Sequence, residues 1–165
     1  QGRLNFISNI ISRVRGNSLV LFHRIEHGKK LYAKLRQESD KTIYYVDGGT
    51  ETSIREEYKK KMEANADVVI VASYGTFSTG ISIKRIHNIF FTESFKSEVI
   101  IRQSIGRGLR QHSSKERVNI IDFVDDLTSP GWDNYLMRHA KARQTIYKEQ
   151  KFEYDIKNVS FEGDI

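Results

Sequence analysis

Apolar residues recur every three or four positions near the start of the chain. Over residues 3–15, Leu4, Ile7, Ile11 and Val14 fall on one face of a helix with 3.6 residues per turn. The other positions of this segment are mostly polar or charged. We therefore expect an amphipathic helix that packs its apolar face on a sheet.

Five short runs rich in apolar residues follow, and continuous apolar runs are typical of strands buried on both faces. Helical patterns alternate with most of these runs. This alternation predicts an α/β fold: a parallel sheet of five or six strands with crossover helices on both faces and ligand-binding loops beyond the carboxyl ends of the strands. The predicted strands are residues 18–23, 42–46, 67–72, 87–92 and 118–124, and the predicted helices between them are 26–38, 51–65 and 96–109.

The last part of the chain, residues 131–165, is expected to form a C-terminal helix and a tail. Residues 131–150 have a helical pattern, and 152–156 alternate apolar and charged side chains, which predicts an edge strand or a docking peptide. The mixed basic and aromatic side chains of 132–151 could grip a nucleic-acid strand, or the aromatics could simply pack on the sheet. No repeat or internal linker is seen, so a single domain over residues 1–165 is expected.

Composition narrows the class of protein. With 27 Lys and Arg against 21 Asp and Glu in 165 residues, the net charge is +6, which favours phosphate-bearing partners. The absence of cysteine excludes disulfide frameworks and Cys-ligated zinc and favours an intracellular location. No apolar run approaches the roughly 18 to 20 residues of a membrane span, so no membrane partner is expected. The five histidines show no metal-ligand spacing, and we expect no metal site.

The most specific string is residues 103–110 (QSIGRGLR). Arg107 and Arg110 are three residues apart, so on a helix both guanidinium groups could reach one triphosphate. A glycine before the first arginine, Gly106, would let another backbone approach closely. From spacing alone, a basic and solvated helix face explains the pattern equally well.

Turns after the predicted strands supply further candidates. Residues 72–83 (ASYGTFSTGISI) combine hydroxyl groups and free backbone N–H groups, which suit the phosphate oxygens of a nucleic-acid strand, although such a loop is often only a turn. His23 and Arg24 end the first strand, where they could touch a phosphate. Gly48 and Gly49 are most simply read as a turn.

Taken together and in this order, these segments resemble the C-terminal lobe of superfamily 2 helicases. Residues 103–110 match the QxxGRxxR motif of that superfamily, and 72–83 resemble the motif that ends in Thr-Gly-x-Asp. Ser82 stands where the family has the aspartate, so ribose recognition by a carboxylate is not expected there. The resemblance implies a RecA-like fold and half of an ATP-dependent motor, in which ATP lies between two lobes.

The resemblance also implies roles for individual residues. Arg110 and Arg107 would be the catalytic arginine-finger residues. The nucleotide would contact Gln103, Gly80, Ser82 and Gly106. The nucleic acid would contact His23, Arg24, Gly48, Gly49, Ser73, Tyr74 and Thr79.

The motor implied by this resemblance needs a partner lobe. The chain has no GxxxxGKS/T loop and no DExx strand end, so the ligands of Mg²⁺ would lie on an N-terminal RecA-like lobe, and this fragment alone would not turn over ATP.

Residues 101–111 are similar to helicases of this superfamily that serve phage recombination. That likeness implies phage recombination and replication, in the host cytoplasm, on DNA or RNA–DNA hybrids that include branched forms. The alternative is a stand-alone RecA-like nucleic-acid-binding or regulatory domain without motor activity. A nucleotide-dependent metabolic enzyme is less favoured, because no first strand ends in GxGxxG.

Overall fold

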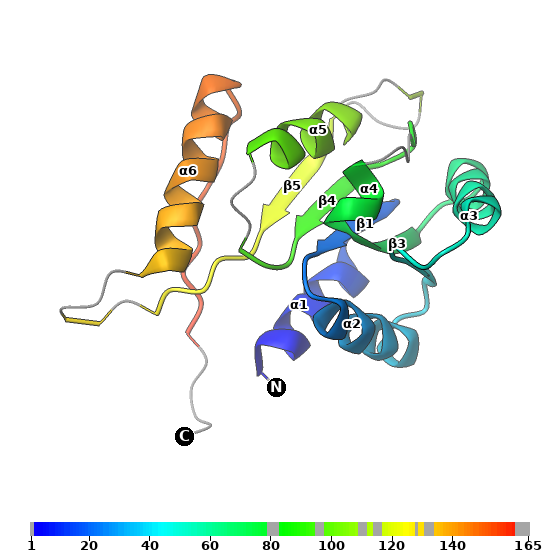
Figure 1. The fold of residues 1–165 in the computed structure, drawn as a ribbon, viewed down its shortest axis with the longest axis horizontal. Helices are drawn as coiled ribbons and strands as arrows, with labels where there is room; N and C mark the ends of the chain where they lie inside the picture. The colour runs from blue at the N-terminus through cyan, green and yellow to red at the C-terminus, as the bar shows by residue number, and fades with distance from the viewer. Residues whose placement is uncertain are drawn as a thin grey trace.

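The chain folds as alternating strands and helices (Figure 1). The computed structural model describes residues 2–78, 83–94, 98–108, 112–113, 117–127, 129–130 and 134–160, with the backbone alone at 78, 98–100 and 107–108. The elements are α1 (Gly2–Arg13), β1 (Ser18–Phe22), α2 (Ile25–Glu38), β2 (Thr42–Val46), α3 (Thr52–Ala64), β3 (Val68–Ser73), α4 (Tyr74–Ser78), β4 (Asn88–Phe91), α5 (Glu98–Gly108), β5 (Asn119–Asp122) and α6 (Tyr135–Glu149).

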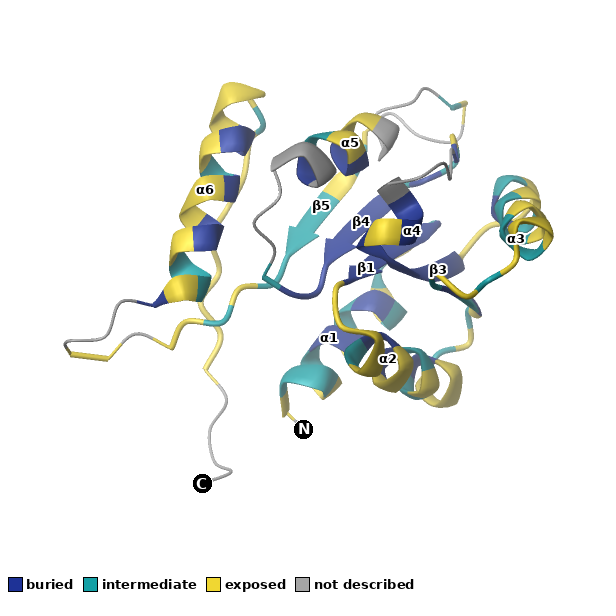
Figure 2. Cartoon of the chain, viewed as in Figure 1, coloured by how far each residue is buried: buried dark blue, intermediate teal, exposed yellow. Residues whose placement is uncertain are grey.

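The five strands form one sheet in the order β2-β3-β1-β4-β5, and every neighbouring pair is parallel. Every residue of β1, β3 and β4 is buried, whereas the edge strands β2 and β5 are partly exposed. Figure 2 shows the contrast between buried β4 and partly exposed β5. The continuous apolar runs are therefore explained by burial on both faces. The predicted parallel α/β sheet is confirmed.

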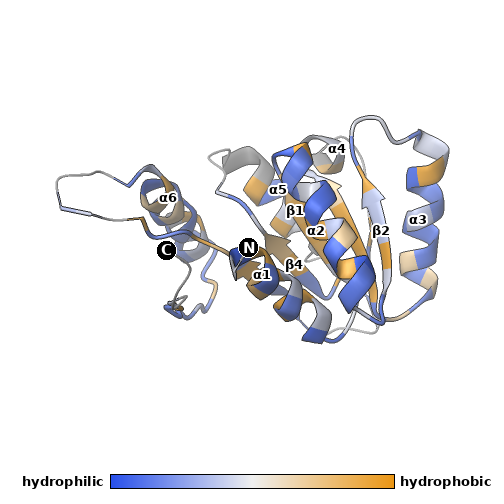
Figure 3. Cartoon of the chain, turned by 90° about the horizontal axis from the view of Figure 1, so that it is seen from below, coloured by the Kyte–Doolittle hydropathy of each residue, from blue (hydrophilic) through white to orange (hydrophobic). Residues whose placement is uncertain are grey.

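Alternate residues of the strands enter two separate cores. Leu19 and Leu21 of β1 join a cluster with side chains from α3, α4, α5 and α6, whereas Val20 and Phe22 join a cluster with α1 and α2. The apolar strands, orange in Figure 3, accordingly lie between helices on both sides. Helices thus cover both faces of the sheet, as expected.

Two structural anchors hold these layers together. Asn17, which is fully buried just before β1, donates through its Nδ2 to the carbonyls of Met62 (2.7 Å) and Asn65 (3.0 Å), and its Oδ1 accepts the N–H of Val68 (3.0 Å). These bonds tie the turn between α3 and β3 to the start of the central strand. On the other side of the sheet, Gly28 lets α2 approach β1 closely, because a Cβ at this position would lie 2.6 Å from ring atoms of Phe22.

Two segments differ in detail from what the sequence predicts. The segment after β3, expected to be a loop, forms the short helix α4 as far as residue 78. The tail was expected to be either an edge strand or a docking peptide, and the edge strand is wrong, because its described residues 150–160 contain no strand. The tail runs back alongside α6 (Figure 1), where the ring of Tyr154 lies 6.2 Å from that of Tyr147.

Candidate functional site at the carboxyl edge of the sheet

The topology brings the predicted turns together at one edge. Because all strands are parallel, their carboxyl ends share that edge. Phe22 at the end of β1 lies in register with Ser73 at the end of β3, and Val46 at the end of β2 pairs with Ala72. The turns that follow β2, β3 and β1 are therefore neighbours, in that order.

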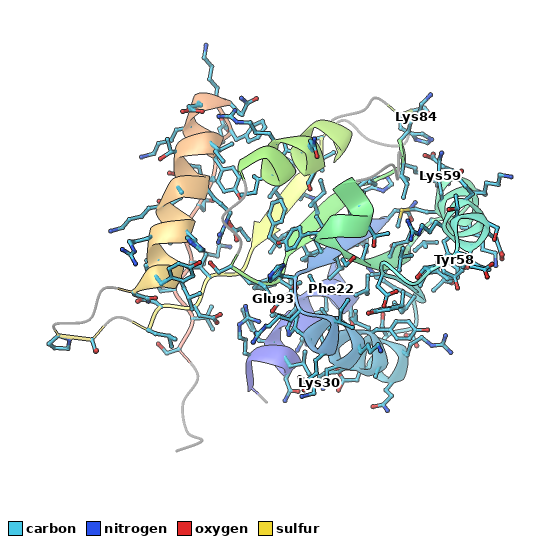
Figure 4. All side chains as sticks on the ribbon, in the orientation of Figure 1. Phe22, Lys30, Tyr58, Lys59, Lys84 and Glu93 are labelled. Atoms are coloured by element: carbon cyan, nitrogen blue, oxygen red, sulfur yellow. The ribbon has the colours of Figure 1, made fainter. Side chains whose placement is uncertain are left out.

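The turn after β1 is held by a residue that the sequence did not single out, Glu93. This residue follows β4 and is only 6% exposed (Figure 4). Its Oε2 accepts the backbone N–H groups of His23 (2.7 Å) and Arg24 (2.9 Å), and its Oε1 accepts the Arg24 Nε (2.6 Å). The side chains of His23 and Arg24 are exposed, so they, rather than their own N–H groups, are placed to reach a phosphate.

The protonation of this glutamate follows from its surroundings. Burial alone would raise the pKa of Glu93, but the hydrogen bonds from the Arg24 side chain and from the two backbone N–H groups outweigh it and lower that pKa below its ordinary value. Glu93 is therefore ionised at neutral pH. The sequence signal that could have identified it is a carboxylate directly after a buried strand.

The turn after β2 is closed by its own side chains. The Oδ1 of Asp47 accepts the N–H of Gly49 (2.9 Å), and the hydroxyl of Thr50 accepts the N–H of Asp47 (3.0 Å). Arg55 of α3 donates through its Nε to the carbonyl of Thr50 (2.7 Å). Gly48 and Gly49 are exposed, and a Cβ on Gly48 would meet nothing within 4 Å. Packing within the chain therefore does not require Gly48, and a ligand backbone would have room there.

The segment after β3 is more buried than expected. The Ser73 hydroxyl lies 2.8 Å from that of Thr76 and accepts the Thr76 N–H (3.3 Å), which starts α4. Tyr74 is 2% exposed and stacks on Phe91 at 6.2 Å, and burial raises the pKa of its hydroxyl. The structure thus places Tyr74 in the core, where its side chain cannot meet a nucleic-acid strand. Thr79, Gly80 and Ser82 lie outside the described residues.

The described part of the arginine motif, residues 103–108, lies on α5, which follows β4 as expected. Ile101 and Ile105 of this helix are buried in the core, whereas Gln103 and Gly106 are exposed. A Cβ on Gly106 would meet nothing within 4 Å, so the described part of the chain makes no close approach to that glycine. Arg107 lies on the helix with only its backbone described, and Arg110 lies outside the described residues.

The basic and aromatic residues of α6 divide between packing and solvent: Arg143 and Tyr147 are buried, whereas Arg138, Lys141 and Lys148 are exposed. Arg143 has a side chain 2% exposed and forms an ion pair with Asp122 at the end of β5, from Nε to Oδ2 at 2.6 Å and from Nη2 to Oδ1 at 3.0 Å. The hydroxyl of Tyr147 donates to the same Oδ2 (3.0 Å). Arg102 of α5 pairs with Glu149. These contacts attach α6 to the sheet and to the motif helix, while Trp132 lies outside the described residues.

The described residues show neither a metal-ligand cluster nor a membrane-spanning helix. They contain no group of three His, Asp or Glu side chains that could hold a metal ion. Within the same part of the chain, no helix combines the length and apolar character needed to cross a membrane.

Comparison with known proteins places the chain among helicases. Residues 2–112 match the model of the helicase conserved C-terminal domain. The chain is 37% identical over 154 residues to the ATP-dependent DNA helicase uvsW of Enterobacteria phage T4. The aligned segment covers 87% of this chain and 30% of that protein. The chain is also 32% identical over 91 residues to the putative ATP-dependent helicase IRC3 of Saccharomyces cerevisiae, covering 55% of this chain and 13% of that protein. The chain thus spans a third or less of these relatives.

Solved helicase structures share the fold of this chain. The crystal structure of T4 UvsW superimposes with a TM-score of 0.75 at 35% identity, covering 95% of this chain and 34% of that one. The C-terminal domain of the DEAD-box protein Dbp5 superimposes with a TM-score of 0.70 at 16% identity, covering 89% and 79% of the two chains. The chain therefore belongs to the helicase conserved C-terminal domain family and is the C-terminal RecA-like lobe of a superfamily 2 helicase.

Proposed function

We propose that this chain is the second motor lobe of an ATP-dependent DNA or RNA–DNA helicase or translocase, acting with an N-terminal RecA-like lobe of the same parent protein. In this proposal the α5 motif faces the nucleotide between the lobes, and the carboxyl-edge turns contact the nucleic-acid backbone. Phage recombination and replication on branched DNA are the proposed setting, on the strength of the 37% identity to the uvsW helicase.

The observation that carries the proposal is the exposed face of α5. Ile101 and Ile105 anchor the helix in the core, so Gln103 and Gly106 are left facing outward, and Gly106 has open space around its Cα. An amide side chain beside an uncrowded glycine fits close contact with a phosphate-bearing ligand. We therefore propose that Gln103 and Gly106 bind the nucleotide from this lobe.

The two arginines complete the proposed nucleotide site. ATP, when bound, supplies the phosphoanhydride whose terminal phosphoryl group is transferred to water, with Mg²⁺ held by the N-terminal lobe. Arg110 would stabilise the charge that develops on that group in the transition state, and Arg107 would also hold the triphosphate in the ground state. This division predicts different kinetic effects for the two residues.

The test uses the longer parent protein with both lobes. Arg110→Ala should lower kcat for DNA-stimulated ATP hydrolysis by about 10³-fold or more while leaving ATP and DNA binding largely intact. Arg110→Lys should not restore the rate, because an ammonium group cannot copy the planar fork of a guanidinium group. Arg107→Ala should also weaken ATP binding.

Arg36→Ala is the matched control. Arg36 is an exposed arginine of α2, and α2 packs on the opposite face of the sheet from α5, so its loss should change kcat less than about twofold. An unchanged kcat in Arg110→Ala would contradict the motor proposal. A lack of DNA-stimulated ATP hydrolysis in the unmodified parent protein would favour a stand-alone nucleic-acid-binding domain instead.

A further inference from the structure

The contact between the ends of β4 and β1 has a consequence for how this edge holds nucleic acid. Glu93 uses both carboxylate oxygens, accepting the His23 and Arg24 N–H groups with Oε2 and the Arg24 Nε with Oε1. The two backbone donors of the turn are therefore already satisfied. A phosphate at this turn therefore cannot be held by the N–H groups of His23 and Arg24.

The same contact orients the Arg24 guanidinium group. The Nε, which lies on one side of the group, is drawn to Glu93 at 2.6 Å, while the side chain as a whole is 75% exposed. Within the described residues, no acceptor contacts the two terminal nitrogens of Arg24. The fork of Nη1 and Nη2 is thus presented outward in a preset orientation, and this geometry matches two oxygens of one phosphate.

We propose that Glu93 is a positioning residue that presents the Arg24 fork to one phosphate of a nucleic-acid backbone crossing the carboxyl edge. The proposal rests on the proposed function and adds the residue that orients one contact. An arginine held in this way loses little freedom when it binds, whereas an untethered exposed arginine must be ordered at the moment of contact.

The proposal predicts that Glu93→Gln weakens DNA binding, which is the opposite of what the change in charge alone predicts. Glu93→Gln removes a negative charge from a surface that binds a polyanion, so simple electrostatics predicts tighter binding. Positioning predicts weaker binding, because a glutamine has one acceptor oxygen; when the two N–H groups of the turn take it, the NH₂ group faces the Arg24 Nε, which loses its acceptor. The direction of the change therefore separates the two explanations.

Glu26→Gln is the matched control for charge. Glu26 lies in the first turn of α2, close to Arg24, with a side chain 79% exposed and paired with Lys30 at 2.6 Å. Its replacement removes the same charge from the same region and also releases a lysine. It forms no hydrogen bond or ion pair with Arg24 or with the backbone of the turn, so binding should stay equal or become tighter.

The experiment measures the Kd for a fluorescein-labelled single-stranded DNA oligonucleotide by anisotropy at several salt concentrations, using the 165-residue protein. Arg24→Ala should weaken binding about fivefold at low salt, as expected for one exposed charge-assisted contact, and should lower the salt slope by about one. Glu93→Gln should weaken binding by at least about twofold. In the double variant, Glu93→Gln should add nothing to Arg24→Ala, because it acts through that arginine.

Folding of each variant is checked by circular dichroism. If Glu93→Gln does not fold, Glu93→Asp takes its place: it keeps the charge and withdraws the carboxylate, so weaker binding with an unchanged charge supports positioning. Equal or tighter binding by the folded Glu93 variant overturns the proposal, and so does unchanged binding by Arg24→Ala. By contrast, salt-independent binding by the unmodified protein would count against the proposed function itself.

Discussion

The buried ion pair between α6 and β5 offers the most direct test of how this lobe is held together. In Arg143→Met a side chain of similar length replaces the arginine, but it carries no charge and no donor. Asp122, with a side chain only 15% exposed, then keeps the Tyr147 hydroxyl at 3.0 Å as its one donor among the contacts described at that carboxylate. The substitution thus leaves a largely buried carboxylate without its counter-charge.

The expected cost follows from this geometry. Removing one member of a buried pair costs about 3–5 kcal/mol of unfolding free energy, and the partial exposure of Asp122 favours the lower end of that range. Adding Asp122→Asn removes the uncompensated charge while keeping an acceptor for Tyr147. The double variant should therefore be more stable than the sum of the two single losses predicts, by about 1 kcal/mol or more.

Urea unfolding followed by circular dichroism measures these free energies. Lys141→Met is the control, because Lys141 is an exposed base on the same helix, and its loss should cost less than about 0.5 kcal/mol. A loss below about 1 kcal/mol in Arg143→Met, or one equal to that of the control, would refute the reasoning. In that case α6 would not depend on the ion pair for its attachment.

Three further predictions concern other parts of the lobe. Gly28→Ala should lower stability by about 1–3 kcal/mol in thermal or urea unfolding, because its Cβ would lie 2.6 Å from ring atoms of Phe22, whereas Gly48→Ala, with nothing within 4 Å, should be nearly neutral. Burial lowers the pKa of His27 below its ordinary 6.5, so near that pH the unfolded chain binds more protons than the folded one. The free energy of unfolding should therefore fall as the pH drops below about 6.5. His27→Gln should flatten this part of a curve of unfolding free energy against pH. The 165-residue protein alone should release no appreciable phosphate from ATP with or without DNA, and turnover near that of an intact motor would contradict this expectation.

Much of the fold follows from the sequence because the relevant signals are local. The five apolar runs became the five strands, with ends shifted by at most two residues, since burial on both faces requires continuous apolar character. Helices α1, α2, α3 and α5 were likewise found from periodicity. Residues 103–108 of the motif accordingly lie on the helix that was predicted over 96–109.

The tertiary structure decided which distant groups meet. Glu93 lies 69 residues from Arg24, and Arg143 lies 21 residues from Asp122, so no local pattern could pair them. Tyr74 looked available in a polar loop, but the start of α4 turns it onto Phe91. The strand order β2-β3-β1-β4-β5 is set by the crossover helices packing on the two faces of the sheet. Such pairings depend on the packing of the whole chain, because these polar groups come within hydrogen-bond distance of each other only when the sheet has formed.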